Sequence, residues 1–127
     1  MEQAIIEEGR NVWLFPDGEL PKPDKNSQYQ AHEALMILNT SGKEAKIKMT
    51  IYFADKDPIE DIQIEVEPKR VKCIRLDKAE EIGGIVIPRH VQYALRLESD
   101  VKIAVTFGRL DTSSEKLAYY VGVAYSY

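Results

Sequence analysis

The feature that most constrains the fold is an alternation of apolar and polar residues at every second position. Between residues 45 and 53, five apolar side chains are separated by lysine, threonine or tyrosine: Ala45, Ile47, Met49, Ile51 and Phe53. Successive side chains of a β-strand point to opposite faces, so this period of two predicts a strand with one face in a core. An amphipathic helix would need a period of 3.6 residues, which the segment lacks.

Similar segments occur along the chain and are separated by turn-forming residues. We predict strands at residues 10–15, 29–38, 45–53, 62–66, 71–76, 91–97, 101–110 and 117–125. Residues 39–43 are interpreted as a hairpin connection, and residues 98–100 as a turn between two strands. About eight short strands predict an all-β fold, an antiparallel sandwich or barrel that forms one domain over residues 1–127. Helix is limited to one or two short turns, near residues 77–81 and 112–116.

The strand predicted at residues 29–38 is apolar on both faces. Ala34, Met36 and Leu38 occupy one face, whereas Leu35 and Ile37 occupy the other. A strand of this kind is covered on both sides. One cover is the core, and the other is either loops or a second subunit.

Composition restricts the class of protein. Hydrophobic residues make up 44% of the 127 residues and charged residues 30%, values that exclude a disordered chain. No apolar run approaches the roughly 20 residues of a membrane-spanning helix. The acidic first residues lack the features of a signal peptide, and Cys73 has no cysteine partner. We therefore expect a cytoplasmic protein.

One predicted strand ends in two charged residues that follow apolar, core-type residues on the same face. Val105 and Phe107 share a face, and the next positions on that face are Arg109 and Asp111. Burial of an unpaired charge is costly, so such residues have a structural or binding role. Arg109 and Asp111 could pair with each other and close the core, or they could contact a ligand.

Three other residues are candidates for ligand contacts. His32 and Glu33 are adjacent in a predicted strand and therefore point to opposite faces, which prevents both from binding one metal ion there. His32 is interpreted as a hydrogen-bonded, half-buried residue or as a ligand contact. Trp13 could stack against a flat ligand or belong to the core.

The tyrosines near the C-terminus favour a homo-oligomer, because tyrosine is common at interfaces.

Four basic residues lie close together at Lys69, Arg70, Lys72 and Arg75. They could protect an exposed edge strand from pairing with other chains, or form a patch for an anionic partner. The net charge of −4 disfavours nucleic-acid binding, because that binding depends on neutralising phosphates.

The sequence contains no motif typical of catalysis. It lacks a phosphate-binding glycine loop, paired cysteines at zinc-binding spacing and a nucleophile elbow. We therefore expect a non-enzymatic protein that uses no metal and no cofactor.

Several motifs in order resemble the cyanobacterial sensory rhodopsin transducer family. These are Gly9…Trp13…Pro16-x-Gly18…Pro21, Ala31-His32-Glu33, Ile37-Leu38-Asn39, Ile51-Tyr52-Phe53-x-Asp55-x-x-Pro58, Lys69-Arg70-x-Lys72-x-x-Arg75, Val105-x-x-x-Arg109-Leu110-Asp111 and Ala124-Tyr125. The resemblance implies a β-sandwich that assembles as a tetramer and has a non-enzymatic role in signalling. It also implies either a small polar ligand, such as a sugar or an anion, or docking on the cytoplasmic face of a membrane receptor. A DNA-binding role has been suggested for the namesake.

The polar signature of that family matches ten positions of this chain. They are Trp13, His32, Glu33, Asn39, Tyr52, Asp55, Arg70, Arg75, Arg109 and Asp111. The ligand site is predicted to use Trp13, His32, Glu33, Tyr52, Arg75, Arg109 and Asp111. The chain departs from the family pattern at Ala31, Cys73 and the pair Thr106-Phe107, which make the local chemistry more apolar.

Overall fold

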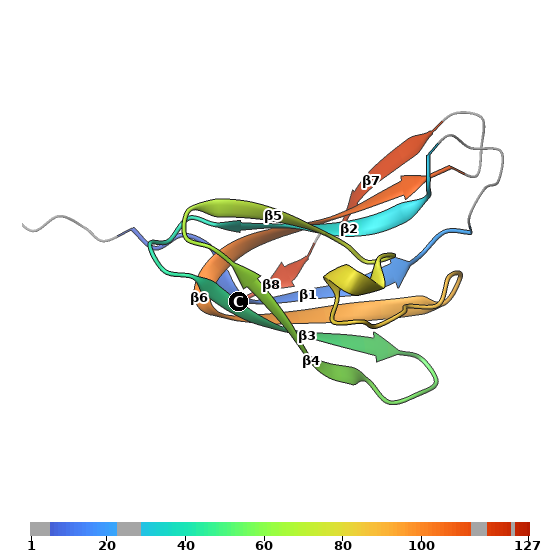
Figure 1. Ribbon diagram of the computed structural model, residues 1–127, viewed down its shortest axis with the longest axis horizontal. Coiled ribbons are helices and arrows are strands. Elements are labelled where there is room, and N and C mark those ends of the chain that lie inside the picture. The colour runs from blue at the N-terminus through green and yellow to red at the C-terminus, as the bar shows by residue number, and fades with distance from the viewer. Residues whose placement is uncertain (1–5, 23–28, 113–116, 123) are drawn as a thin grey trace, which may run out of the picture.

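The protein folds into two facing β-sheets that share one long strand (Figure 1). The structure is a computed structural model that describes residues 6–22, 29–112, 117–122 and 124–127. Within these ranges all the pairings are antiparallel, and helix is limited to a 3-10 turn, η1, at Ala79–Glu81. The all-β, antiparallel fold predicted from the sequence is confirmed, as is the helical turn near residue 79.

The first sheet has five strands. In spatial order they are β4 (Ile59–Val66), β3 (Ala45–Phe53), β6 (Gln92–Asp111), β1 (Arg10–Glu19) and β8 (Tyr125–Ser126). The alternation predicted for residues 45–53 is present in β3, where Ile47, Met49 and Ile51 are fully buried between exposed or half-buried residues. This sheet forms the lower layer in Figure 1.

The second sheet has four strands, one of which is the C-terminal half of β6. The others are β5 (Arg70–Arg75), β2 (His32–Asn39) and β7 (Ala118–Gly122), in the spatial order β5-β2-β6-β7. The last predicted strand is therefore two strands in different sheets, because β7 pairs with β6 and β8 pairs with β1. The helical turn predicted at residues 112–116 falls mainly on positions outside the described residues.

The turn predicted at residues 98–100 is wrong, because strand β6 runs through these residues. These residues continue the strand, whose first half pairs with β1 and β3 and whose second half pairs with β2 and β7. The carbonyl of Ser99 and the carboxylate of Asp100 accept hydrogen bonds from other strands. The side chain of Asn11 donates to the carbonyl of Ser99 at 3.0 Å, and Asp100 accepts a bond from the Lys46 N–H at 2.9 Å.

The connection at residues 39–43 also differs from the prediction. It is not a hairpin, because β2 and β3 belong to different sheets. The buried side chain of Asn39 holds this crossing in place. Its amide donates to the carbonyls of Lys43 at 2.7 Å and Val66 at 3.2 Å, and its oxygen accepts from Ser41.

The core lies between the two layers. Its members are the inward-facing residues of both sheets, including Leu35 and Ile37 from β2 and Leu95 and Leu97 from β6. Burial of each such side chain stabilises the fold by roughly 1.5–3 kcal/mol. The sandwich is therefore held by apolar contact between sheets, with β6 as a covalent link.

The outer face of the second sheet stays apolar although no other element of the described chain covers it. Strand pairing places Val71, Leu38 and Ala104 in one row, and Val121 and Tyr119 lie further along the same face. Val71 is 68% exposed, Leu38 42% and Val121 63%. The apolar character predicted for both faces of residues 29–38 is therefore present, but loops do not cover the outer one.

Candidate functional site

A buried carboxylate lies at the centre of the candidate site. Glu33 is fully buried on the inner face of β2 and receives three hydrogen bonds. Its Oε1 accepts from the Glu19 N–H at 2.8 Å and from the Tyr93 hydroxyl at 2.7 Å, while its Oε2 accepts from Arg109 Nε at 2.8 Å. The carboxylate therefore joins β1, β2 and both halves of β6.

Strand register explains this convergence. Glu33 and Arg109 are direct cross-strand partners in the β2–β6 pair, so their side chains share the inner face. Tyr93 comes from the other half of β6 and lies opposite Gly18, where a Cβ atom would be 2.5 Å from the tyrosine ring. The absence of a side chain at Gly18 therefore lets the ring reach Glu33.

The electrostatics of the cluster follow from its burial. Burial raises the pKa of Tyr93 far above its usual value, and the charge of Glu33 raises it further. Burial also raises the pKa of Glu33, and the bonds from Tyr93 and Arg109 offset that effect only in part. For Arg109, burial lowers the pKa, but the hydrogen bond that it donates to Glu33, together with the charges of Glu33 and Asp17, outweighs burial and the pKa is raised. Arg109 is thus a fixed cation, and Tyr93 stays neutral at physiological pH.

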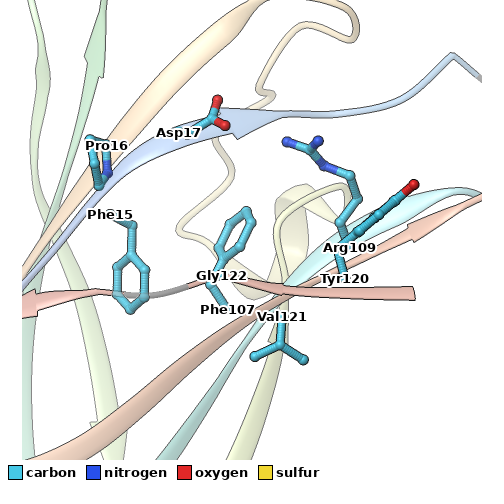
Figure 2. A pocket seen from close by; sticks show the side chains of 8 residues that line it. All are labelled: Phe15, Pro16, Asp17, Phe107, Arg109, Tyr120, Val121 and Gly122. Atoms are coloured by element: carbon cyan, nitrogen blue, oxygen red, sulfur yellow. The ribbon is translucent and has the colours of Figure 1, made fainter. Parts of the chain in front are cut away.

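A cavity of about 320 Å³ opens beside Arg109, between β1, β6 and β7 (Figure 2). Its lining residues are Phe15, Pro16, Asp17, Phe107, Arg109, Tyr120, Val121 and Gly122. The rings of Phe15 and Phe107 lie 5.9 Å apart between their centroids. The cavity therefore combines an apolar floor with one cation and one carboxylate.

A bulge in β1 brings Asp17 to the rim of this cavity. Phe15 pairs with Leu95 and Gly18 pairs with Tyr93, so β1 has one more residue than its partner over this stretch. Pro16 lies in the bulge. Its lack of a backbone N–H costs no hydrogen bond of the sheet at that position. Asp17 is exposed, and within the described ranges it forms no ion pair.

One interpretation of the sequence was an ion pair between Asp111 and Arg109, and this ion pair does not form. The partner of Arg109 is Glu33, which lies directly across the sheet. Asp111 instead lies with Arg109 along a second, shallower hollow of about 290 Å³, lined also by Glu19, Pro21, Lys22 and His90. Arg109 thus borders both hollows, and acidic residues outnumber basic ones around it.

Arg75 lies in a different cluster from Arg109. Its Nε and one terminal nitrogen each donate to the carboxylate of Asp77 at 2.7 Å, and Arg89 approaches the same carboxylate at 3.6 Å. Burial raises the pKa of Asp77, but the hydrogen bonds and the positive charge of Arg75 together outweigh burial, so the pKa is lowered overall. Asp77 thus engages one edge of this guanidinium, and Arg75 does not line the cavity.

The remaining predicted site residues lie apart from the cavity. Trp13 is half-buried against the core and donates to the Arg10 carbonyl at 3.1 Å. His32 is half-buried, with Nδ1 2.8 Å from the carbonyl of Gln30, and lies on the opposite face of β2 from Glu33. Tyr52 is 39% exposed on β3. The structure therefore brings together only Glu33, Arg109 and Asp111 from the predicted set.

The basic patch is present but mixed in charge. Lys69 occupies a turn with φ of +55°, and Arg70 and Lys72 are exposed on edge strand β5. Arg70 and Lys72 line a hollow together with Glu44, Glu65 and Glu67, and Lys72 donates to the carbonyl of Glu65 at 3.0 Å. The acidic neighbours weaken any attraction for a polyanion.

Sequence reasoning missed the residues that form the cavity itself. Phe15, Asp17, Phe107 and Tyr120 were not predicted to act together, and Tyr93 was not predicted to bond Glu33 beside the cavity. The one usable signal was Pro16-Asp17-Gly18 directly after an apolar strand, since proline and glycine in a strand mark bulges and close approaches.

Metal-binding clusters and membrane-spanning helices are both absent from the described residues. Three or more histidine, cysteine or acidic side chains placed to hold a metal ion do not occur there. Among the helical segments in those same ranges, none has the length and apolarity needed to cross a bilayer.

Comparison with known proteins identifies the relatives of this fold. The family model described as Anabaena sensory rhodopsin transducer matches residues 8–126. The chain belongs to this family. The resemblance drawn from the sequence motifs is therefore confirmed.

Two solved structures support the assignment to the transducer family. The crystal structure of Thermotoga maritima 1070 is similar with a TM-score of 0.82 and 30% identity, over 94% of this chain and 96% of that one. The Anabaena sensory rhodopsin transducer is similar with a TM-score of 0.69 and 29% identity, over 85% of this chain and 95% of that one. The search of curated proteins found no match.

Proposed function

We propose that this transducer-family domain is a non-enzymatic sensor that binds a small polar ligand in the cavity beside Arg109. The observation that carries the proposal is the fixed guanidinium at the edge of an apolar cavity. Glu33 holds Nε of Arg109, and the rest of the guanidinium extends toward the cavity (Figure 2). A preformed, largely apolar hollow with a few oriented polar groups is typical of small-molecule sites.

The cavity also offers a route from binding to a signal. Its wall includes β7, which belongs to the second sheet, whereas Phe15 and Asp17 belong to the first. A ligand seated there would contact both layers and alter their relative position. We expect the domain to act in the cytoplasm, without metal or cofactor.

Blocking the cavity tests the proposal. A side chain at Gly122 would extend toward Phe107, because a Cβ atom added there would lie 3.1 Å from the nearest atom of that ring. We expect a compound from a panel of monosaccharides, amino acids, nucleotides and organic anions to raise the melting temperature of the parent protein. Gly122→Leu should abolish that shift.

The matched control is Gly42→Leu, because nothing lies within 4 Å of a Cβ atom at Gly42. This variant should respond to the compound as the parent does. Arg109→Ala is a poorer test, since it leaves the buried Glu33 without its cation. A shift that persists in Gly122→Leu, or a panel without any response, would contradict binding in this cavity.

A second role concerns partners rather than ligands. We propose that the apolar outer face of the second sheet is the contact surface of a homo-oligomer, in keeping with the tetramer expected from the family resemblance. Large exposed apolar patches mark interfaces, and Val71, Leu38 and Val121 are all exposed there. Docking on a membrane receptor is the alternative use of this face, with the exposed Arg70 at its edge.

Light scattering distinguishes these uses. We expect the parent protein to have the mass of an oligomer, and Val71→Glu to lower it by placing a charge in the apolar contact. The control is Glu60→Lys, a charge change at an exposed position of β4 in the other sheet. A monomeric parent would contradict the homo-oligomer and leave the face free for a receptor.

A further inference from the structure

We propose that the ligand of this cavity is a small zwitterion, such as a free α-amino acid with an apolar side chain. Its carboxylate would bind the guanidinium of Arg109, and its ammonium group would bind Asp17. The inference rests on the proposed function, because it requires that the cavity hold a ligand. It specifies the chemical class of that ligand, which the proposed function leaves open.

Arg109 is prepared to receive a carboxylate. Glu33 accepts from Nε at 2.8 Å, and within the described ranges no protein group accepts from the two terminal nitrogens. These nitrogens extend into the space between β1 and β7 (Figure 2). A guanidinium held on one edge presents its remaining donors in a fixed geometry, which suits a planar carboxylate.

Asp17 supplies the opposite charge on the neighbouring strand. It lines the same cavity as Arg109, and its charge helps to raise the pKa of that arginine, but the two lie too far apart to form an ion pair. Within the described ranges Asp17 forms no ion pair with any other residue. A cation and an anion that border one hollow without meeting can each take a group of opposite charge. The ligand that satisfies both carries a carboxylate and an amine.

The charges argue against a simple anion or a simple cation. Glu33 already neutralises Arg109. Along the two hollows the remaining carboxylates, Asp17, Glu19 and Asp111, outnumber the other basic residues, Lys22 and His90. A phosphate dianion would meet this excess of carboxylates. A lone amine would meet the guanidinium, so neither class fits both ends of the cavity.

The lining also argues against a neutral sugar. A neutral sugar could form hydrogen bonds with Arg109 and Asp17 but would compensate neither charge, and asparagine, glutamine, serine and threonine are absent from the residues that line the cavity. The uncharged polar side chain present there is that of Tyr120. The floor of Phe15 and Phe107, in a volume of about 320 Å³, suits an aliphatic or aromatic side chain instead.

The test uses three amino acids and matched analogues of one of them. L-alanine, L-leucine and L-phenylalanine are titrated into the full-length parent protein, with melting temperature and calorimetry as readouts. The analogues of leucine are 4-methylpentanoate, which lacks the ammonium, and 3-methylbutylamine, which lacks the carboxylate. Glucose and inorganic phosphate represent the other classes. We expect leucine or phenylalanine to bind at least tenfold more tightly than either analogue, glucose or phosphate.

The deciding variant is Asp17→Asn, which keeps the shape of an exposed side chain and removes its charge. Binding of the amino acid should weaken about ten- to a hundredfold, while 4-methylpentanoate should bind unchanged or more tightly. A Glu60→Gln variant, exposed on β4, serves as a charge-matched control and should bind as the parent does.

Failure of this inference can be separated from failure of the proposed function. A response to glucose that Gly122→Leu abolishes, without a response to amino acids, would overturn the zwitterion and support the cavity as a ligand site. Amino-acid binding that is unchanged in Asp17→Asn would also overturn it. Amino-acid binding that is unchanged in Gly122→Leu would contradict both proposals.

Discussion

Replacing Glu33 by alanine is expected to lower the free energy of unfolding by about 3 kcal/mol. The change removes the acceptor of three hydrogen bonds, from Arg109, Tyr93 and the backbone of Glu19. Loss of one partner of a buried ion pair costs about 3–5 kcal/mol. We expect the lower end of that range, because the side chain of Arg109 is 27% exposed and can still reach water. Urea unfolding at pH 7 measures the difference.

The control for this prediction is Tyr93→Phe, which removes one of the three donors and keeps the ring. Its expected cost at pH 7 is about 1 kcal/mol, the net contribution of one hydrogen bond. If Glu33→Ala costs no more than Tyr93→Phe, the carboxylate is not the centre of the cluster.

The stability difference between the parent and Tyr93→Phe should also depend on pH. The pKa of Tyr93 is raised in the folded state because of its burial, whereas in the unfolded chain it is close to 10.0. Above pH 10 the unfolded state therefore loses this proton while the folded state keeps it. The free energy of unfolding of the parent therefore falls as pH rises through that range. Tyr93→Phe has no hydroxyl at this position, so it lacks this pH-dependent loss of stability. The difference between the two proteins should narrow above pH 10.

Gly18→Ala is expected to destabilise the fold by about 1–3 kcal/mol, the usual cost of overpacking a filled site. The new Cβ atom would lie 2.5 Å from the ring of Tyr93, which is itself 1% exposed and has no space to retreat. Displacement of the ring would also break its bond to Glu33. Chemical unfolding measures the loss, and near-ultraviolet circular dichroism follows the aromatic environment.

Gly42→Ala is the matched control, because a Cβ atom there meets nothing within 4 Å. It should leave the stability unchanged or raise it slightly by restricting the unfolded chain. Equal stability of the two alanine variants would mean that Tyr93 can move without penalty, and the cluster around Glu33 would then tolerate a different arrangement.

The fold was more predictable than its connections. Alternation in β3 and β4 depends on local burial of one face, so sequence alone identified these strands. The polar residues Glu98, Ser99 and Asp100 were wrongly predicted to form a turn. The Ser99 carbonyl and the Asp100 carboxylate bond to Asn11 and Lys46, which are far away in sequence, and no local pattern reports such bonds.

The candidate site was only half predictable for the same reason. Arg109 was visible because a charge continued an apolar stripe, and an ion pair with Asp111 was one of two interpretations, the other being a ligand contact. The actual partner, Glu33, depends on the register between β2 and β6. Phe15 and Tyr120 join the cavity through the packing of two sheets, which residue spacing does not specify.

The shared strand has a consequence for synthesis of the protein. β1, β2 and β3 all hydrogen-bond to β6, which ends at Asp111. On the ribosome, the β3–β4 and β2–β5 pairs can form early, but β1 must wait until residues 92–103 of β6 have emerged from the exit tunnel. Long-range pairing of this kind folds slowly and exposes unpaired strands in the meantime. Nascent chains halted before β6 should therefore depend on chaperones far more than the finished protein does.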